Sequence, residues 1–434
     1  MSSYKFKSAA DGFTSELNLF HTPPLDSAIV SYEYQEYNNK APLTANSIIE
    51  FDISAGSGDY ISLEKSTIKT QVRILKQNGD PITNKDPVAM VNFSMHSLFA
   101  QVELSLQQTA LSPSVGRNYP YKAIIDTLLS KDESAKETYL QAEGFFKDSA
   151  GSLAETNPAS GTNSGLLLRY HSTANGKVWE MQGPLHTDFG QQPRALISGV
   201  PVNIKMHPSS NAFRLMAHTN EQYRVEIVDI VLILCRVKLN PGVIIGHANA
   251  IKEINAIYPY QQSAIKCFTI SAGTYSFSET DLFQNLVPDK LCVALVSSKG
   301  YAGNYKDNPY NFKHYGCNFI SFEVDGKSVP SRALQPDFAN NKYSSCYLSL
   351  SKYDGIYQKN TGNFISNHDY KNGYTLFCFD LSGRHDEGYM SLSKKGETKL
   401  NIQFSRPVPE SVTVIVYCKY LNVLQIDQSR NVIL

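Results

Sequence analysis

Hydrophobic and polar residues alternate with a period of two along most of the chain. A strand that buries one face shows this pattern, because successive side chains point to opposite sides of a sheet. The pattern predicts strands at 47–53, 66–75, 100–106, 200–206 and 223–239 in the first half, and at 264–270, 290–297, 318–326, 374–381, 398–404 and 411–424 in the second. Clusters of Gly, Pro, Asn and Asp, such as "KQNGDPITN", separate these segments and indicate turns.

The segment "YRVEIVDIVLILCRVKL" (223–239) is the longest of the predicted strands. Alternation places seven apolar residues on one face, namely Val225, Ile227, Val231, Ile233, Cys235, Val237 and Leu239. Asp229 interrupts that face, and the opposite face is apolar only in its centre. We expect a strand buried on one side throughout and on both sides in the middle. Asp229 is then either half of a buried interface pair or a carboxylate held by backbone donors or solvent.

Helical patterns are few. Residues 121–130 ("YKAIIDTLLS") fit an amphipathic helix, and residues 246–257 fit a second helix. Many short strands with few helices predict an all-β protein built from sandwiches or barrels.

Part of the strand pattern occurs twice. "VLILCRV" (231–237) is similar to "VIVYCKY" (414–420), "NIKM" (203–206) to "NIQF" (401–404), and 96–113 to 314–330, in the same order. Three similarities in one order indicate duplication of a β-domain. The first copy is longer, and the polar stretches 131–165 and 207–222 are the expected sites of surface loop insertions.

The repeat predicts four parts of the chain. Residues 1–24 form an N-terminal arm, 25–240 the first β-domain, 241–260 a linker with a short helix, and 261–434 the second β-domain. The pair Pro23–Pro24 favours an extended course for the arm.

Composition narrows the function. The chain has 40 basic and 40 acidic residues, which argues against a protein whose main task is to grip phosphates, and Lys5 and Lys7 are the only hint of a basic arm. No apolar run reaches the ~18 residues of a membrane span, and the first residues lack the apolar core of a signal peptide. The seven cysteines are scattered singly, which favours free thiols and synthesis in a reducing compartment.

Candidate chemistry is sparse. His186 and Asp188 ("LHTDF"), and His385, Asp386 and Glu387 ("RHDEG"), pair imidazoles with carboxylates, but neither set has the spacing of a metal motif such as H-E-x-x-H. Both sets lie in turn-rich connections, so we expect solvated loop side chains. No catalytic, cofactor-binding or metal-ligating residue is predicted, and the chain is not expected to be an enzyme.

Several segments resemble a known family. "ELNLFHTPPLDSAI", "HSLFAQVELSL", "YPYKAIIDTLLS", "NPYNFKHYGCNFISFEVDGKSVPS" and "LQPDF" look like the double jelly-roll major capsid proteins of icosahedral double-stranded DNA viruses, and more closely those of Polinton- or adintovirus-type elements in animal genomes. The resemblance spans nearly the whole chain and is most specific in "NPYNFKHY…NFISFEVDG".

The resemblance implies an architecture and a role. It implies two tandem eight-stranded jelly rolls with a few short helices in loops, and a homotrimer that tiles a shell around a DNA genome. Implied partners are further copies of the chain, vertex (penton) and minor capsid proteins, and DNA only indirectly, with the virion as the location. Three alternatives remain open: a minor or vertex capsid protein of the same lineage, a tandem β-sandwich carbohydrate-binding or adhesion module, and an enzyme on a cupin-like jelly roll.

Overall fold

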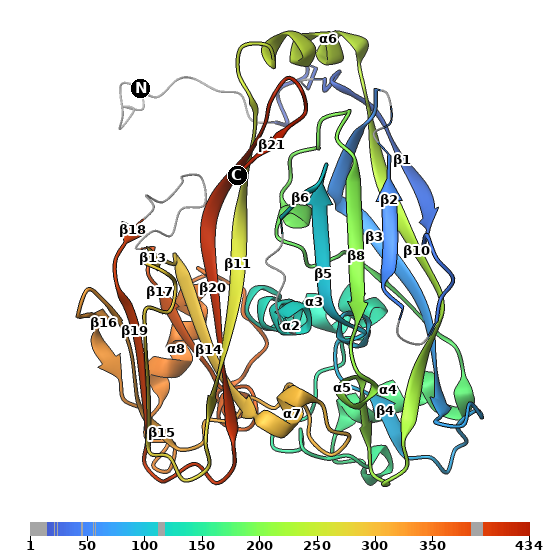
Figure 1. The fold of residues 1–434 in the computed structure, drawn as a ribbon. Helices are drawn as coiled ribbons and strands as arrows, with labels where there is room; N and C mark the ends of the chain where they lie inside the picture. Colours follow the sequence, from blue (N-terminus) through green and yellow to red (C-terminus); the bar gives the residue numbers. More distant parts are fainter. Residues whose placement is uncertain are drawn as a thin grey trace.

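The chain folds into two β-sandwiches joined by a helix at one end (Figure 1). This computed structural model describes residues 15–20, 22–23, 25–44, 47–54, 56, 58–111, 118–382 and 394–434. The predicted Lys5, Lys7, His385, Asp386 and Glu387 lie outside these ranges.

The first sandwich consists of two antiparallel four-stranded sheets. One sheet has the order β1 (Ile29–Asn38), β10 (Tyr223–Leu239), β3 (Tyr60–Lys76) and β7 (Trp179–Gly183). The facing sheet has the order β2 (Ile49–Ile53), β8 (Val202–Pro208), β5 (Phe99–Leu106) and β6 (Thr109–Ala110). Apolar residues of both sheets, among them Phe51, Ile68, Val102 and Leu232, form one buried cluster.

The second sandwich repeats this topology. One sheet has the order β11 (Ala256–Ile270), β20 (Val412–Ile426), β14 (Lys290–Ser297) and β17 (Leu376–Asp380), with β21 (Val432–Ile433) paired to β20. The other has the order β12 (Ser276–Thr280), β19 (Thr398–Phe404), β15 (Cys317–Val324) and β16 (Lys327–Leu334). The same order of eight strands in both halves is the double jelly roll, so the predicted fold class is confirmed.

The three sequence similarities fall on equivalent strands. In one of them, however, the aligned residues point to opposite faces of their sheets. β10 and β20 occupy the same place in their sheets, as do β8 and β19. Cys235 lies opposite the exposed Tyr34, on the outer face of its sheet, whereas Leu234 points into the sandwich. Cys418 points into its sandwich, because its neighbours Tyr417 and Lys419 reach outward.

Two corrections concern the long strand β10. The register with β3 shifts between Ile227 and Asp229, and Val228 is the extra residue of a β-bulge. The buried face therefore changes from Val225 to Ile230, Leu232 and Leu234, and the predicted single face is wrong. The bulge leaves Asp229 exposed, in agreement with the solvated alternative.

Strand β1 was absent from the predicted set. Its face carrying Val30, Tyr32, Tyr34 and Glu36 is exposed, so the hydrophobic signal of a buried strand is missing from its sequence. Backbone pairing with β10 decides its conformation instead.

The helices and small sheets lie mainly in the connections. The predicted helix at 121–130 is confirmed as α2 (Asn118–Ser130), whereas the second predicted helix lies earlier than expected, as α6 (Pro241–Ala250), with Asn240 capping its first turn. β11 begins at Ala256, so the expected linker contains the start of a strand. The remaining elements are α1 (Ser94–Ser97), α3 (Glu133–Glu137), η1 (Tyr139–Glu143), η2 (Pro158–Ser160), α4 (Ser164–Thr173), η3 (Ala174–Gly176), η4 (Phe189–Gln191), α5 (Asn211–Arg214), α7 (Ser298–Ala302), α8 (Ser344–Tyr353), α9 (Asn367–Lys371) and the pairs β4 (Val88–Met90) with β9 (Leu215–Ala217) and β13 (Leu286–Val287) with β18 (Lys394–Lys395).

Candidate assembly surface and the junction between the sandwiches

The outer face of the second sandwich is covered from two sides. Helix α8 packs on β17, and helix α2 of the first sandwich packs against β11 and reaches β20. As a result the residues of β20 from Val412 to Cys418 are all buried, with Val414 and Val416 facing their own sandwich and Ile415 and Tyr417 facing outward. This central strand is therefore buried on both faces over that range.

Charged side chains connect α2 to the second sandwich. The Asp126 carboxylate lies 2.7 Å from Lys419 Nζ and accepts a hydrogen bond of 2.7 Å from Tyr417 Oη. Lys122 Nζ lies 2.6 Å from Asp188 Oδ1, and Asp188 in turn accepts hydrogen bonds from the backbone N–H and the hydroxyl of Ser263. These four ionic groups are mostly buried, and each has an opposite charge or hydrogen-bond donor beside it.

The charge states of Asp126 and Lys419 follow from their surroundings. Burial alone would raise the pKa of Asp126, but Lys419 and Lys122 more than offset it and hold that pKa below its ordinary value of 3.8. Burial likewise would lower the pKa of Lys419, but Asp126 beside it raises the net value. Both residues are therefore ionised at neutral pH.

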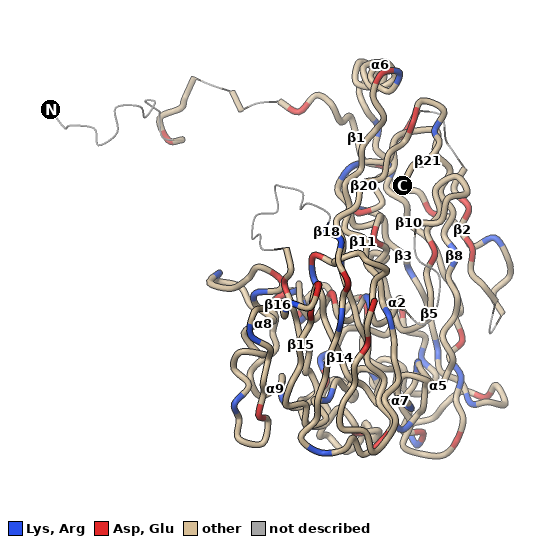
Figure 2. The backbone as a smooth tube through the Cα atoms, turned by 60° about the vertical axis from the view of Figure 1, so that its left-hand side comes forward, with Lys and Arg blue, Asp and Glu red and all other residues tan. Residues whose placement is uncertain are grey.

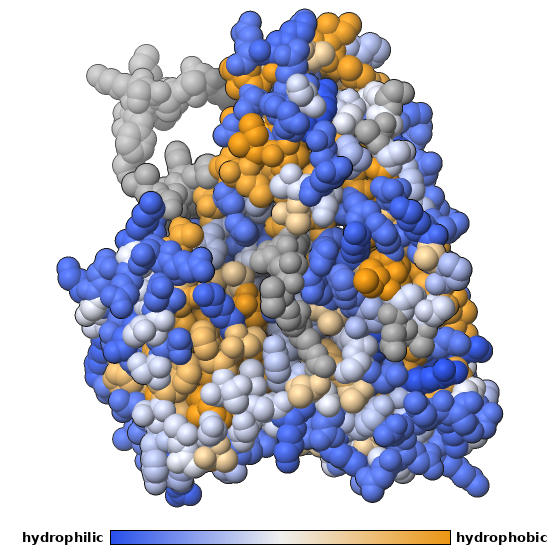
Figure 3. Space-filling model, viewed as in Figure 1, coloured by the Kyte–Doolittle hydropathy of each residue, from blue (hydrophilic) through white to orange (hydrophobic). Residues whose placement is uncertain are grey.

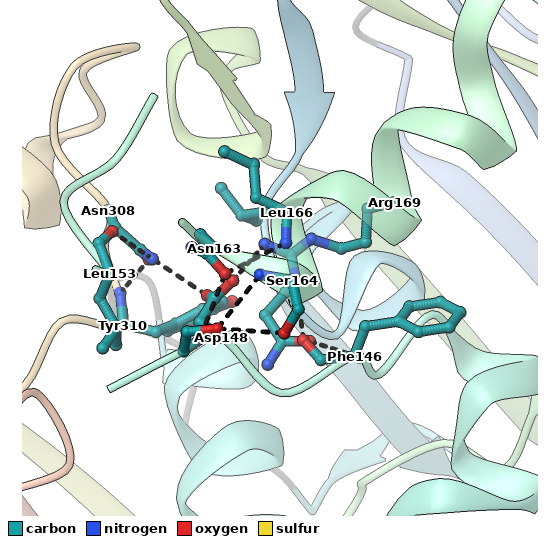
Figure 4. A network of polar contacts seen from close by, with 12 residues as sticks. Phe146, Asp148, Leu153, Asn163, Ser164, Leu166, Arg169, Asn308 and Tyr310 are labelled. Atoms are coloured by element: carbon teal, nitrogen blue, oxygen red, sulfur yellow. Dashed lines mark hydrogen bonds and ion pairs between the residues drawn. The ribbon is translucent and has the colours of Figure 1, made fainter. Parts of the chain in front are cut away.

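A second polar network lies where the long insertion of the first sandwich meets the second sandwich (Figure 4). Arg169 Nη2 donates to Asp148 Oδ1 at 2.7 Å, while its Nε and Nη1 donate to the carbonyls of Met90 and Phe146. Asp148 also accepts from Asn308 of the second sandwich at 3.2 Å. The buried guanidinium of Arg169 therefore joins α4 to β4 and to the segment 146–148. Asp148 extends this network to Asn308 of the second sandwich.

The insertion at 131–165 is correspondingly not a free surface loop. Lys147 Nζ lies 2.7 Å from Asp369 Oδ2, and the buried Lys136 donates to the carbonyls of Leu128 and Asn363. Burial lowers the pKa of Lys136 to about 7. The predicted surface position therefore holds for part of this stretch: Glu133, Ser134 and Ser160 are exposed, whereas Lys136, Lys147 and Asp148 contact the second sandwich.

The predicted pair His186 and Asp188 is also buried, at 6% and 8% exposure, so its prediction as solvated loop residues is wrong. Both follow β7 in a turn-rich connection, as expected, but that connection is enclosed by α2, α1 and the start of β11. The hydrophobic period and the residue spacing could not predict the burial of His186 and Asp188, because the residues that enclose them come from elsewhere in the chain.

The corresponding outer face of the first sandwich remains open. Val30 and Tyr34 of β1 are 66% and 62% exposed. Beside them, Val231 and Ile233 of β10 are half-buried. The face that α2 and α8 cover in the second sandwich is therefore exposed to solvent in the first sandwich. This exposed face carries apolar and aromatic side chains.

Charge and apolar character are distributed differently over the surface. Basic and acidic residues are interspersed along the tube in Figure 2, without a stripe of one sign. Apolar side chains gather beneath α6, over the upper ends of β11 and β20 (Figure 3). The exposed apolar residues in these elements and the nearby C-terminus are Ile245, Ile257, Ile433 and Leu434. Among the described residues, no helix combines the length and apolar character needed to cross a bilayer.

The amino-acid sequence has a similar counterpart in Caenorhabditis elegans. No protein-family model matches the chain. The uncharacterized protein F54H12.2 of Caenorhabditis elegans is 26% identical over 423 residues, covering 94% of this chain and 98% of that protein.

Solved structures give a wider set of similarities. A subunit of the PBCV-1 virus capsid superposes with a TM-score of 0.63 at 10% identity, covering 96% of this chain and 99% of that one. A chain of the Sputnik virophage superposes at 0.60 with 11% identity (98% and 92% covered), and the mavirus major capsid protein at 0.53 with 11% identity (100% and 96% covered). The chain therefore has the double jelly-roll fold of these viral proteins over nearly its full length.

Proposed function

We propose that this protein is a major capsid subunit that forms homotrimers, which then tile an icosahedral shell around a double-stranded DNA genome. The observation that carries the proposal is the pair of sandwiches with one topology, of which one has a covered outer face and the other an open one. The similarity in fold to viral capsid proteins supports it.

Symmetry explains why these features belong together. Within one chain, the sheet of β11, β20, β14 and β17 in the second sandwich packs against α2 of the first sandwich. This contact is head-to-tail, because it joins different surfaces of the two sandwiches. Such a contact closes into a ring when the rotation between units fits. Three chains supply six similar sandwiches, and the open face around Tyr34 is then covered by a neighbouring copy. A ring of six similar edges is a suitable tile for a hexagonal lattice.

The finer parts of the proposal follow from the sequence resemblance. These are the Polinton and adintovirus lineage, vertex and minor capsid proteins as partners, location in the virion, and contact with DNA only indirectly. The interspersed charges in Figure 2 are consistent with indirect contact, because direct binding to phosphates requires a concentrated basic surface.

Light scattering coupled to size exclusion tests the proposal on the full chain. The expected species is a trimer of about 145 kDa, three times the 48.3 kDa of one chain. Negative-stain microscopy is expected to show six-lobed particles, or lattices and shells built from them. A monomer that persists across salt concentrations and pH values contradicts the proposal.

A further inference from the structure

Three metal-ligating side chains from three separate connections meet inside the first sandwich. His96 comes from α1, Glu143 from the end of η1, and His186 from the segment after β7. His96 Nε2 lies 2.8 Å and His186 Nε2 lies 3.9 Å from the same Glu143 oxygen, Oε2. All three ligand atoms lie within 4.8 Å of one another, and the three residues are only 1%, 2% and 6% exposed.

One of these atoms makes no hydrogen bond. His186 Nε2 is buried, and its contact with Glu143 Oε2 at 3.9 Å is too long for a hydrogen bond. Native proteins keep few buried polar atoms without a hydrogen bond, because each is destabilising. The atom lies on the side of the ring that faces Glu143, where a bound cation would provide the missing interaction.

We propose that His96, Glu143 and His186 bind a divalent transition-metal ion, with Zn²⁺ as the best fit. Two imidazoles and one carboxylate are a donor set that favours Zn²⁺ over Mg²⁺ or Ca²⁺, which prefer oxygen ligands. Bonds of about 2.0–2.1 Å in a tetrahedral site place ligand atoms about 3.3 Å apart. The observed separations of 2.8 and 3.9 Å from Glu143 Oε2 to the two histidine nitrogens lie on either side of this value.

The surroundings position the two imidazoles. Tyr119 Oη lies 2.8 Å from His96 Nδ1, and the exposed Gln191 amide lies 3.3 Å from His186 Nδ1. When a metal binds through Nε2, each Nδ1 carries the proton and donates a hydrogen bond to these neighbours, with the Gln191 amide turned so that its oxygen accepts.

Gly183 makes the buried position of Glu143 possible. A Cβ atom at Gly183 would lie 2.4 Å from Glu143 Cγ. Among the residues that the structure describes, no such arrangement surrounds His314, the histidine that the repeat aligns with His96. That ring stacks on Phe338 at 4.1 Å and accepts a hydrogen bond from the Gly316 N–H. The proposed site is therefore a feature of the first sandwich, where it ties three connections together.

Zinc titration of the untagged full chain, stripped with a chelator, tests the site. Calorimetry is expected to show one Zn²⁺ per chain, and Mg²⁺ is expected to give no comparable heat. At a hundredfold excess over Kd, Zn²⁺ is expected to raise Tm by about 3 °C. Absence of stoichiometric zinc binding overturns the proposal.

Two ligand variants and one control make the test specific. His186→Gln and Glu143→Gln are expected to weaken Zn²⁺ binding at least about tenfold, while His314→Gln binds as the natural chain does. His186→Gln is the more informative variant, because its Nε2 makes no hydrogen bond and its Nδ1 makes one of 3.3 Å with the exposed Gln191, so the zinc-free Tm is expected to fall less than in Glu143→Gln. Unchanged zinc affinity in His186→Gln also overturns the site. Trimer formation is measured separately by light scattering, so failure of the site leaves the capsid proposal standing.

Discussion

The Asp126 carboxylate of α2 and the Lys419 ammonium of β20 lie 2.7 Å apart, 293 positions distant in sequence and almost enclosed by protein. Their side chains are only 10% and 16% exposed. This pair and Tyr417 hold one sandwich against the other. Removing one partner leaves the other charge buried without compensation, which is more costly than removing both.

Asp126→Asn is therefore expected to lower the free energy of unfolding by about 3–5 kcal/mol, and addition of Lys419→Met is expected to recover much of the loss. Denaturant unfolding measures both. Asp52→Asn, which removes the exposed pair of Asp52 with Lys40, is the control and is expected to change stability by at most about 1 kcal/mol. Equal effects at the two sites contradict the role of burial.

Acid is expected to weaken this junction. Because the folded-state pKa of Asp126 lies below the unfolded value of 3.8, its contribution to stability is complete well above pH 3.8 and is lost as pH falls through the folded-state pKa. The stability difference between the natural chain and Asp126→Asn should shrink over that range. Unfolding curves measured at successive pH values test this, and a difference that stays constant in acid contradicts it.

Arg169→Lys is expected to destabilise the protein by about 2–4 kcal/mol although the charge is kept. A lysine cannot reproduce the three directions in which Arg169 donates to Met90, Phe146 and Asp148. Thermal or denaturant unfolding gives the value. Arg332→Lys, on the exposed strand β16, should change stability by less than about 0.5 kcal/mol. A similar small change for Arg169→Lys would show that the network in Figure 4 adds little.

Gly373→Ala is expected to cost about 2–4 kcal/mol. Gly373 has φ +119°, and a Cβ there would lie 2.5 Å from Leu153 Cδ1, across the junction. Gly326 also has a positive φ, +72°, but a Cβ there meets nothing within 4 Å. Gly326→Ala should therefore cost only the backbone penalty of about 1–2 kcal/mol. Comparison of the two unfolding free energies separates the packing effect from the backbone effect, and equal values contradict close packing at Leu153.

Tyr34→Glu is expected to shift the proposed trimer toward monomer without loss of fold. The side chain is 62% exposed on the open face of the first sandwich, so the monomer tolerates a charge there, whereas a covered interface does not. Light scattering measures the mass and circular dichroism the fold. Tyr275→Glu, at a residue 60% exposed in the turn before β12, is the control and should leave the trimer intact. An undiminished trimer in Tyr34→Glu places the subunit interface elsewhere.

The period-two pattern of apolar residues determined where most of the strands lie along the chain. Strands such as β5, β8 and β19 bury alternate residues, because only the face that points into the sandwich requires apolar side chains. The order of similar segments determined that the strand set occurs twice. Strand β1 gave no such signal, since its outward face is exposed in the single chain.

Only the tertiary structure decided which side chains meet. The bulge at Val228 exposed Asp229, and the packing of α2 on β20 buried Lys419 while the aligned Arg236 bonds instead to Gln35 of β1. His96, Glu143 and His186 are dispersed over 91 positions and come together because three connections converge inside one sandwich. Alternation records the environment of each residue along its own strand, whereas contacts between distant segments depend on how the folded elements are placed in space.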